Sequence, residues 1–453
     1  MGGTSTKIFK KGASAFSSVT GAGHEEGYHP QNFERTFKGS PFVLIRHGSM
    51  YFDEDGDLAH EFYVEVLPQG KRGRPTMRRV TESLQPEGIV PLPYPRLHMI
   101  TMRRKMKRKT VIVGLLTCLT LWLLDYFGAF THFFERTYDD NFQYPYNGNV
   151  PELISQLRNH ELPDVPTITS YNYTFLSDCK KKCIDEDNPQ LRLVFLIKSA
   201  VHNFEQRKAI RNSWGFERRF SDVPVRTVFL LGVDPNNTEL QRKILVEQSK
   251  YGDIVQADFI DVYYNNTIKT MMGFRWIMEN CLNSKFYMFS DDDMYISTKN
   301  VLKFLRDPTS YPDLKGSLRG TDYELPDDVK LFSGFVFISA PHRHRSSKWY
   351  VPLSEYPYHL WPPYVTAGAY ILSKEALIDM YYASMYTQHF RLDDIYLGLV
   401  AKKAGIEPYH CSEFHFYQKP YDINSYRFVI ASHGFNPEEL VRIWNEQKTA
   451  GHA

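Results

Sequence analysis

A run of twenty mostly apolar residues, from Val111 to Phe130, divides this chain into two unequal parts. An α-helix needs about twenty apolar residues to cross the hydrocarbon core of a bilayer. The residues just before the run are strongly basic, whereas Glu135, Asp139 and Asp140 follow it. Because basic flanks stay in the cytoplasm, this asymmetry predicts a single transmembrane helix followed by a lumenal domain. Asp125 interrupts the run near its lumenal end, where a carboxylate can reach water.

The first 110 residues show no sustained helical or strand period. They contain a basic cluster at 71–79 and a Pro-rich stretch before the apolar run. This composition predicts a largely disordered cytoplasmic tail over 1–110. A start of translation at Met102 is an alternative, because a short basic segment followed by an apolar run is how single-span proteins with short tails begin. The sequence leaves open whether residues 1–101 are translated.

Residues 131–190 are rich in Pro, Asn and Asp, and their apolar runs are short. That composition predicts a flexible stem between the membrane and a folded domain over residues 191–453. Over the whole chain, 54 Lys and Arg residues stand against 52 Asp and Glu residues, a formal net charge of +2. This near-balance gives no reason to expect nucleic acid as a partner.

Cysteines and glycosylation acceptors concentrate after the apolar run. Four of the five cysteines lie there: Cys179, Cys183, Cys281 and Cys411. An even number is compatible with two disulfides in an oxidising compartment, and the sequence leaves their pairing open. Three N-x-S/T acceptors are predicted sites of N-glycosylation: Asn172, Asn236 and Asn265.

From residue 191 onward, apolar runs of strand length alternate with helical segments. The predicted strands lie at 192–199, 226–233 and 253–259 and at the start of 285–297, and the predicted helices at 205–214, 238–250 and 268–281. Strands that are apolar on both faces and separated by helices are typical of a mostly parallel sheet covered on two sides. The fold class is therefore predicted to be α/β. In such sheets, ligands bind at the carboxyl ends of the strands.

Three consecutive aspartates, Asp291, Asp292 and Asp293, directly follow the apolar strand segment FYMF. Neighbouring side chains of an extended chain point to opposite sides, so Asp291 and Asp293 share one side and Asp292 takes the other. Three adjacent carboxylates repel one another unless a cation neutralises them. Oxygen ligands of this kind suit Mg²⁺ or Mn²⁺ held together with a substrate diphosphate. An ordinary acidic turn is the alternative interpretation.

The DDD motif resembles the DxD of nucleotide-sugar-dependent glycosyltransferases. Its surroundings resemble the β-1,3-galactosyl-, N-acetylgalactosaminyl- and N-acetylglucosaminyltransferases over roughly residues 190–445. Blocks similar to this family lie in order at 199–215, 261–270, 347–357, 361–373, 391–406 and 432–444. The chain departs from the family pattern twice: Ala367, Gly368 and Ala369 stand where many members have three glycines, and Asp393 stands where many have Glu. These departures put the choice of donor sugar in doubt.

The resemblance implies a Golgi type II membrane enzyme of the GT-A type, with a single-domain, Rossmann-like catalytic fold. It would transfer galactose or N-acetylgalactosamine, with inversion, from a UDP-sugar to the 3-hydroxyl of a glycan on lipid or protein, using Mn²⁺ or Mg²⁺. Resemblance to invertebrate members favours a glycolipid acceptor. Alternatives are a UDP-N-acetylglucosamine-dependent transferase, a metal-dependent hydrolase and a catalytically silent lumenal binding or chaperone-like relative. A homo- or hetero-oligomer is compatible with this picture.

The resemblance also assigns roles to individual residues. The metal ligands would be Asp293, Asp291 and His433, although a histidine in such a loop is ordinarily a surface residue. Asp394 would be the general base that takes the proton of the acceptor hydroxyl, with Asp393 supporting it. The ordinary explanation for acids at a helix start is the helix dipole.

Further candidates would contact the donor and the acceptor. Arg207 and Arg211 lie four residues apart, hence on one helix face, and guanidinium groups suit a diphosphate. They would bind the donor together with the three aspartates. Sugar rings stack on aromatic side chains, and two aromatic-rich blocks precede Asp393. The sugar-pocket candidates are Lys348, Trp349, Tyr364 and Gly368.

Overall fold

The computed structural model describes residues 8–10, 42–66, 76–97, 108–138, 142–184, 190–220, 223–312 and 324–453. The chain forms two compact units, residues 1–114 and 115–453.

The first unit consists of short paired strands in its described residues. These are β1 (Ile8–Lys10), β2 (Phe42–His47), β3 (Tyr51–Phe52), β4 (Leu58–Ala59), β5 (Phe62–Val66), β6 (Thr76–Val80), β7 (Gln85–Pro86) and β8 (Ile89–Leu97). They pair antiparallel in the orders β1-β5-β6, β2-β8 and β4-β3-β7. This unit differs from the disordered tail that the sequence predicts. Several of its strands are too short to leave a recognisable period in the sequence, although aromatic and β-branched residues in β5 favour a strand.

Helix α1 (Arg108–Tyr126) occupies most of the apolar run for which a transmembrane helix over 111–130 is predicted. Many apolar side chains between Val111 and Leu124 are exposed to solvent. Within the described part of the chain, no helix combines the length and the apolar character needed to cross a membrane. Membrane insertion of this segment therefore stays a prediction.

The second unit is built on an eight-stranded sheet of order β17-β15-β16-β13-β10-β11-β12-β9. Its four central strands are parallel neighbours: β13 (Ser284–Asp291), β10 (Leu191–Lys198), β11 (Val225–Val233) and β12 (Ile254–Ile260). Antiparallel pairing joins the outer strands β9 (Phe175–Ser177) and β16 (Tyr364–Ser373) to this centre and β15 (Phe332–Phe337) to β16, while β17 (Tyr409–His410) pairs parallel with β15. The predicted α/β class and parallel sheet are confirmed for the centre, and the sequence missed the antiparallel edges.

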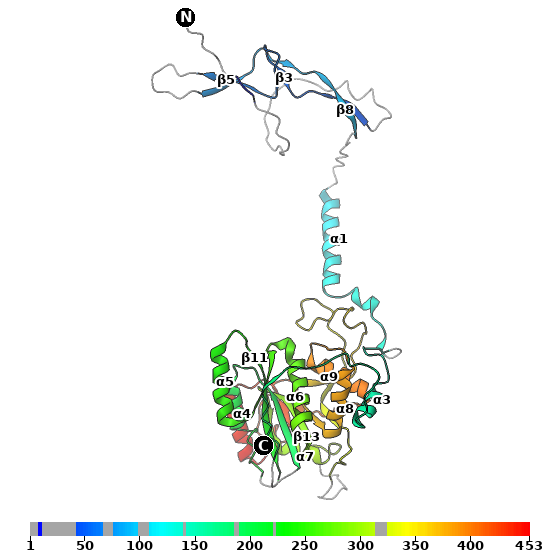
Figure 1. Ribbon diagram of the computed structural model, residues 1–453, viewed down its shortest axis with the longest axis vertical. Helices are drawn as coiled ribbons and strands as arrows, with labels where there is room; N and C mark the ends of the chain where they lie inside the picture. The colour runs from blue at the N-terminus through cyan, green and yellow to red at the C-terminus, as the bar shows by residue number, and fades with distance from the viewer. Residues whose placement is uncertain are drawn as a thin grey trace, which may run out of the picture. The chain divides into compact units, whose positions relative to one another are not determined.

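Helices cover both faces of this sheet (Figure 1). One face carries α4 (Phe204–Arg211), α5 (Thr238–Tyr251), α7 (Thr298–Arg306) and α10 (Pro437–Thr449), and the other α3 (Val150–Arg158), α6 (Asn266–Asn280), α8 (Lys374–Met385) and α9 (Asp393–Ala404). In β10, Phe195 and Ile197 pack in one core cluster while Val194 and Leu196 pack in the other. Burial on both faces explains why these strands are continuous apolar runs.

The predicted stem packs against the rest of the second unit over much of its described length. Its helix α3 buries Val150, Leu153 and Ile154 in the core. Arg158, at the end of the same helix, donates to Glu375 at 2.7 Å. Strand β9 extends the sheet edge, so this segment is less of a free spacer than its composition predicts.

The structure contains one disulfide among its described residues, between Cys183 and Cys281. Cys179 and Cys411 are free thiols there, half-buried and buried respectively. Of the two disulfides with which the number of cysteines is compatible, the described residues form one. The bond ties the end of the predicted stem to the residue after α6, which fixes this segment against the sheet.

Candidate active site

Lys198 and Asp291 end two neighbouring parallel strands, β10 and β13, and lie opposite each other in register. The buried Lys198 ammonium is 3.0 Å from Asp291 Oδ1 and 2.8 Å from Asp393 Oδ2. It also donates to the carbonyl of Ala367 at 3.0 Å. Burial alone lowers the pKa of Lys198, but the two carboxylates more than offset this and raise it. Lys198 therefore stays charged and joins the two acidic motifs.

No sequence pattern predicted a role for Lys198. The available signal was a lysine that directly follows five apolar, buried residues, 193–197, at the end of a strand. A charge at such a position needs a partner, because an unpaired buried charge is costly. Its partners lie 93 and 195 residues further along the chain, which no local pattern reveals.

The alternation predicted for the three aspartates agrees with their contacts. Asp292 is buried away from the other two, and its Oδ2 accepts hydrogen bonds from Ser199 Oγ at 2.6 Å and Asn203 Nδ2 at 2.9 Å. These bonds attach the turn after β13 to the loop after β10. The structure thus gives Asp292 an internal, positioning contact in place of the predicted donor contact.

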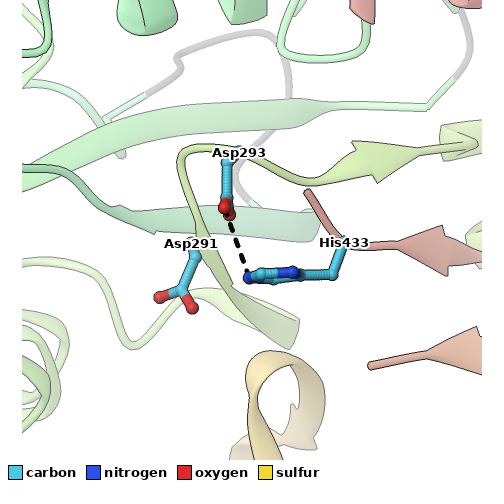
Figure 2. A group of neighbouring side chains, drawn as sticks. All are labelled: Asp291, Asp293 and His433. Carbon is cyan, nitrogen blue, oxygen red and sulfur yellow. Dashed lines mark ion pairs between the residues drawn. The ribbon is translucent and has the colours of Figure 1, made fainter. Parts of the chain in front are cut away.

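Asp291, Asp293 and His433 form a compact group whose potential ligand atoms all lie within 4.8 Å of one another (Figure 2). The short strands β14 (Tyr295–Ile296) and β19 (Ala431–Ser432) pair antiparallel, which brings His433 back beside Asp293. His433 Nε2 is 3.2 Å from Asp293 Oδ2. The backbone N–H groups of Gly434 and Phe435 donate to the Asp293 carbonyl at 3.1 and 2.9 Å and fix this approach.

The chemistry of this group fits a divalent cation. Two carboxylates and one imidazole are ligands that Mn²⁺ accepts, and carboxylates suit Mg²⁺ as well. Asp293 Oδ1 is buried and has no hydrogen-bond partner among the described residues, as expected for an atom that meets a ligand. Burial raises the pKa of Asp291 to about 6 although Lys198 opposes the shift. Burial also raises the pKa of Asp293, and His433 opposes that shift.

Asp393 and Asp394 form the first turn of α9, beside this group. Asp393 is held by Lys198, whereas Asp394 Oδ1 accepts from the backbone N–H of Ile395 at 2.8 Å. Burial, and secondly the charge of Asp393, raise the pKa of Asp394 to about 7. A carboxyl that titrates near neutrality is suited to accept and release a proton at physiological pH.

One cavity of about 570 Å³ borders both acidic motifs. Its charged and imidazole lining comprises Lys198, Asp291, His342, Arg391, Asp393, Asp394 and His433, and its aromatic lining comprises Tyr263, Phe337, Trp349, Trp361, Tyr364 and Phe416. Polar groups converging beside aromatic walls are typical of a substrate pocket. Of the sugar-pocket candidates, Trp349 and Tyr364 thus line the cavity. Tyr263, His342 and Arg391 also line the cavity, although no sequence pattern predicted them as site residues.

The other two sugar-pocket candidates lie close to the cavity. The Lys348 ammonium lies over the ring of Trp349, 4.5 Å from its centroid. A Cβ atom added to Gly368 would meet Met294, His433 and Asp291 at 3.5 to 3.9 Å, ordinary contact distances. Gly368 therefore adjoins the Asp291–Asp293–His433 group, and its backbone leaves room there.

The structure corrects the prediction that Arg207 and Arg211 bind the donor. Arg207 is fully buried and donates to Glu247 at 2.8 to 3.1 Å, to Ser199 Oγ and to the Ala200 carbonyl. Arg211 donates to Glu247 at 2.6 Å and twice to Asp253 at 2.8 Å. Neither side chain is among the described residues that line the cavity. The two arginines do lie on one face of the helix, as their spacing predicts. That face meets the carboxylates of Glu247 and Asp253 inside the domain.

Arg207→Met is expected to destabilise the fold by about 3 to 5 kcal/mol, because it leaves the Glu247 carboxylate buried and short of its main partner. The melting temperature should fall accordingly, while the KM for the donor changes little in the protein that remains folded. Thermal unfolding and initial-rate kinetics measure both. The matched control is Lys208→Met, an exposed cation on the same helix, which should change neither. A selective rise in donor KM with an unchanged melting temperature would restore the donor-binding role.

The two parts of the chain match two different families. A family model described as Tumour suppressor candidate 2 matches residues 3–100. A family model described as Galactosyltransferase matches residues 205–412.

Curated relatives extend the second match. The chain is 44% identical over 350 residues to beta-1,3-galactosyltransferase brn of Drosophila melanogaster, covering 76% of this chain and 98% of the relative. It is 33% identical over 311 residues to human beta-1,3-galactosyltransferase 1, covering 68% and 90% of the two chains. For human beta-1,3-galactosyltransferase 2, the identity is 31% over 288 residues, with 62% and 64% covered. Identity at this level over nearly the whole length of a relative shows that the chain belongs to the β-1,3-galactosyltransferase family of hexosyltransferases.

Proposed function

We propose that this enzyme transfers galactose from UDP-galactose to the 3-hydroxyl of an acceptor glycan, with inversion at the anomeric carbon and with Mn²⁺ as its cation, on a catalytic domain of the GT-A type. The observation that carries the proposal is that Asp394, Asp291 and His433 line one cavity. A proton acceptor and a cation-binding group therefore face a common space of about 570 Å³. The names of the relatives support galactose as the donor sugar and the 3-position as the site of transfer.

The proposed reaction is a single displacement. The acceptor hydroxyl oxygen forms a bond to the anomeric carbon while the bond from that carbon to the β-phosphate oxygen breaks, and UDP leaves. The hydroxyl proton passes to the Asp394 carboxylate. When bound by Asp291, Asp293 and His433, a divalent ion supplies positive charge against the departing diphosphate. Lys198 holds Asp291 and Asp393 in place, so the cation group and the base keep a fixed separation.

A general base must be ionised to accept a proton, so activity should depend on pH through Asp394. With its pKa raised to about 7, kcat should rise as pH increases through about 7, level off above it and fall about tenfold per pH unit below it. Initial rates at saturating UDP-galactose, acceptor and Mn²⁺ between about pH 5.5 and about pH 8.5 measure this profile. A flat profile over that range would contradict the assignment of the base.

A donor panel tests the proposed function directly. The purified full chain is incubated with Mn²⁺ and radiolabelled UDP-galactose, UDP-N-acetylgalactosamine or UDP-N-acetylglucosamine, with glycolipid and N-glycan acceptors in separate reactions. We expect transfer from UDP-galactose, with the new linkage at the 3-position by methylation analysis. Transfer from either N-acetylhexosamine donor alone would replace the proposed donor, and no transfer from any donor would overturn the function.

We also propose that the enzyme is anchored in the Golgi membrane by residues 111–130, with its catalytic domain in the lumen. The basic flank supports this orientation, and the apolar run and the exposed apolar side chains of α1 support insertion into a membrane. Of the three glycosylation acceptors, Asn172 and Asn236 are exposed, whereas the Asn265 amide donates to the Ile260 carbonyl at 2.8 Å. Carbonate extraction and protease protection of sealed vesicles test the anchoring, and endoglycosidase digestion tests the glycans.

A further inference from the structure

Two large aromatic side chains stand at the cavity with much of their surface in solvent. Tyr263 is 51% exposed and Trp349 is 42% exposed, and both line the cavity that Asp394 borders. Tyr263 belongs to the short helix η2 (Tyr263–Asn265) between β12 and α6, and Trp349 belongs to a loop between β15 and β16. Exposed aromatic surface that gathers at a cavity is typical of a binding site.

The Tyr263 ring is held in position by the loop that carries Trp349. Trp349 Nε1 donates to the Tyr263 hydroxyl at 3.0 Å. The Lys348 ammonium lies 5.3 Å from the centroid of the Tyr263 ring. Tyr264, the next residue along the chain, donates from its hydroxyl to the Lys348 carbonyl at 3.0 Å. A ring fixed before a ligand arrives loses little entropy on binding, which favours affinity.

Tyr263 also lies within electrostatic reach of the proposed base. Partial burial raises the pKa of Tyr263, the hydrogen bond from Trp349 opposes the shift, and the carboxylates of Asp394, Asp393 and Asp291 raise the pKa further. Together with the shared cavity, this places an aromatic surface beside the group that would take the acceptor's proton. Trp349 is less free to stack on a ligand, because Lys348 lies over its ring and His342 packs against it at 5.6 Å between centroids.

We propose that Tyr263 determines acceptor specificity: its ring stacks on the apolar C–H face of a neutral hexopyranose at the end of the acceptor and so presents the 3-hydroxyl to Asp394. Stacking on aromatic rings is a general way to grip the C–H face of a sugar. Trp349 and Lys348 act through Tyr263 as positioning residues. This inference rests on the proposed galactosyl transfer and names the part of the cavity that receives the acceptor.

The test compares the acceptor and donor kinetics of variants in the full chain. Tyr263→Ala is expected to raise the acceptor KM about tenfold, with kcat within about threefold of wild type and an unchanged KM for UDP-galactose. Tyr263→Phe, which keeps the ring but loses the hydrogen bond from Trp349, should give an intermediate rise in the acceptor KM of about threefold. Trp349→Phe, which removes the N–H donor to Tyr263, should give an intermediate rise. Tyr409→Ala, at an exposed tyrosine outside the described cavity lining, is the control for loss of an aromatic side chain and should change neither KM.

The possible results separate this inference from the function on which it rests. An unchanged acceptor KM in Tyr263→Ala overturns the inference and leaves the transferase function standing. Equal rises in the KM of donor and acceptor, or a lower melting temperature with reduced kcat, show a merely structural role and also overturn it. If the wild-type chain transfers no galactose from UDP-galactose, the proposed function and this inference both fail.

Discussion

Asp394→Asn is expected to reduce kcat by about 10² to 10⁴, the contribution of a well-placed general base. The amide has nearly the shape of the carboxylate but accepts no proton at neutral pH, so the acceptor hydroxyl loses its proton acceptor. Donor binding should be preserved, because in our assignment Asp394 contacts the acceptor and not the diphosphate. Radiolabelled transfer measures kcat, and calorimetric titration with UDP in the presence of Mn²⁺ measures donor-side binding.

The matched control for this prediction is Asp328→Asn, the same substitution at an exposed aspartate. It should leave kcat and UDP binding unchanged. Asp394→Glu extends the test, since it keeps the carboxylate but moves it by one methylene. If Asp394→Asn retains more than about a tenth of wild-type turnover, the proton goes elsewhere and Asp393 becomes the next candidate.

Removal of the divalent cation should have a comparably large effect. We expect EDTA to abolish transfer and excess Mn²⁺ to restore it, because the cation balances the charge of the departing diphosphate. Asp293→Asn and His433→Ala should each weaken Mn²⁺ binding by at least about tenfold and lower turnover at limiting Mn²⁺. Electron paramagnetic resonance of free Mn²⁺ reports binding without any requirement for turnover.

His132→Ala is the control for the histidine substitution, because His132 is a largely exposed histidine paired only with Glu135 among its described contacts. It should leave Mn²⁺ binding unchanged. Full activity of the wild type after exhaustive chelation would contradict a cation-dependent mechanism. Normal Mn²⁺ affinity in both Asp293→Asn and His433→Ala would instead place the cation at other ligands.

The parts of the fold that the sequence predicted are those whose periodicity is local. The strands predicted at 192–199, 226–233 and 253–259 lie within one residue of β10, β11 and β12. Apolar residues that are buried on both faces fill most of β10 and β11, whereas β12 exposes Asp258 and Ile260. Gly405 ends α9 in the left-handed conformation, at a φ of 69°, as is usual for a glycine directly after a helix. Strands β15 and β16 were missed because their antiparallel pairing depends on distant partners.

The same difference between local patterns and long-range contacts applies to the residues of the candidate site. Alternation along an extended chain correctly predicted that Asp292 points away from Asp291 and Asp293. Asp292 contacts Ser199, whereas Asp291 and Asp293 lie together beside His433. The prediction that His433 lies beside the aspartates rested on the family resemblance and not on any local pattern in the sequence. Arg207 and Arg211 show the limit of spacing arguments: four residues apart fixes a common helix face, but only packing shows that this face meets Glu247 and Asp253. Lys198 depended on long-range partners and was missed altogether.

The pairing of β14 with β19 limits how far this enzyme can be truncated. The Galactosyltransferase family model matches residues 205–412, whereas Lys198 precedes this segment and His433 follows it. A fragment cut at those limits would keep the family signature and lose both the lysine that joins the acidic motifs and the imidazole of the cation group. On the proposed assignment, part of the catalytic chemistry therefore lies outside residues 205–412, and an active fragment must extend beyond that segment on both sides.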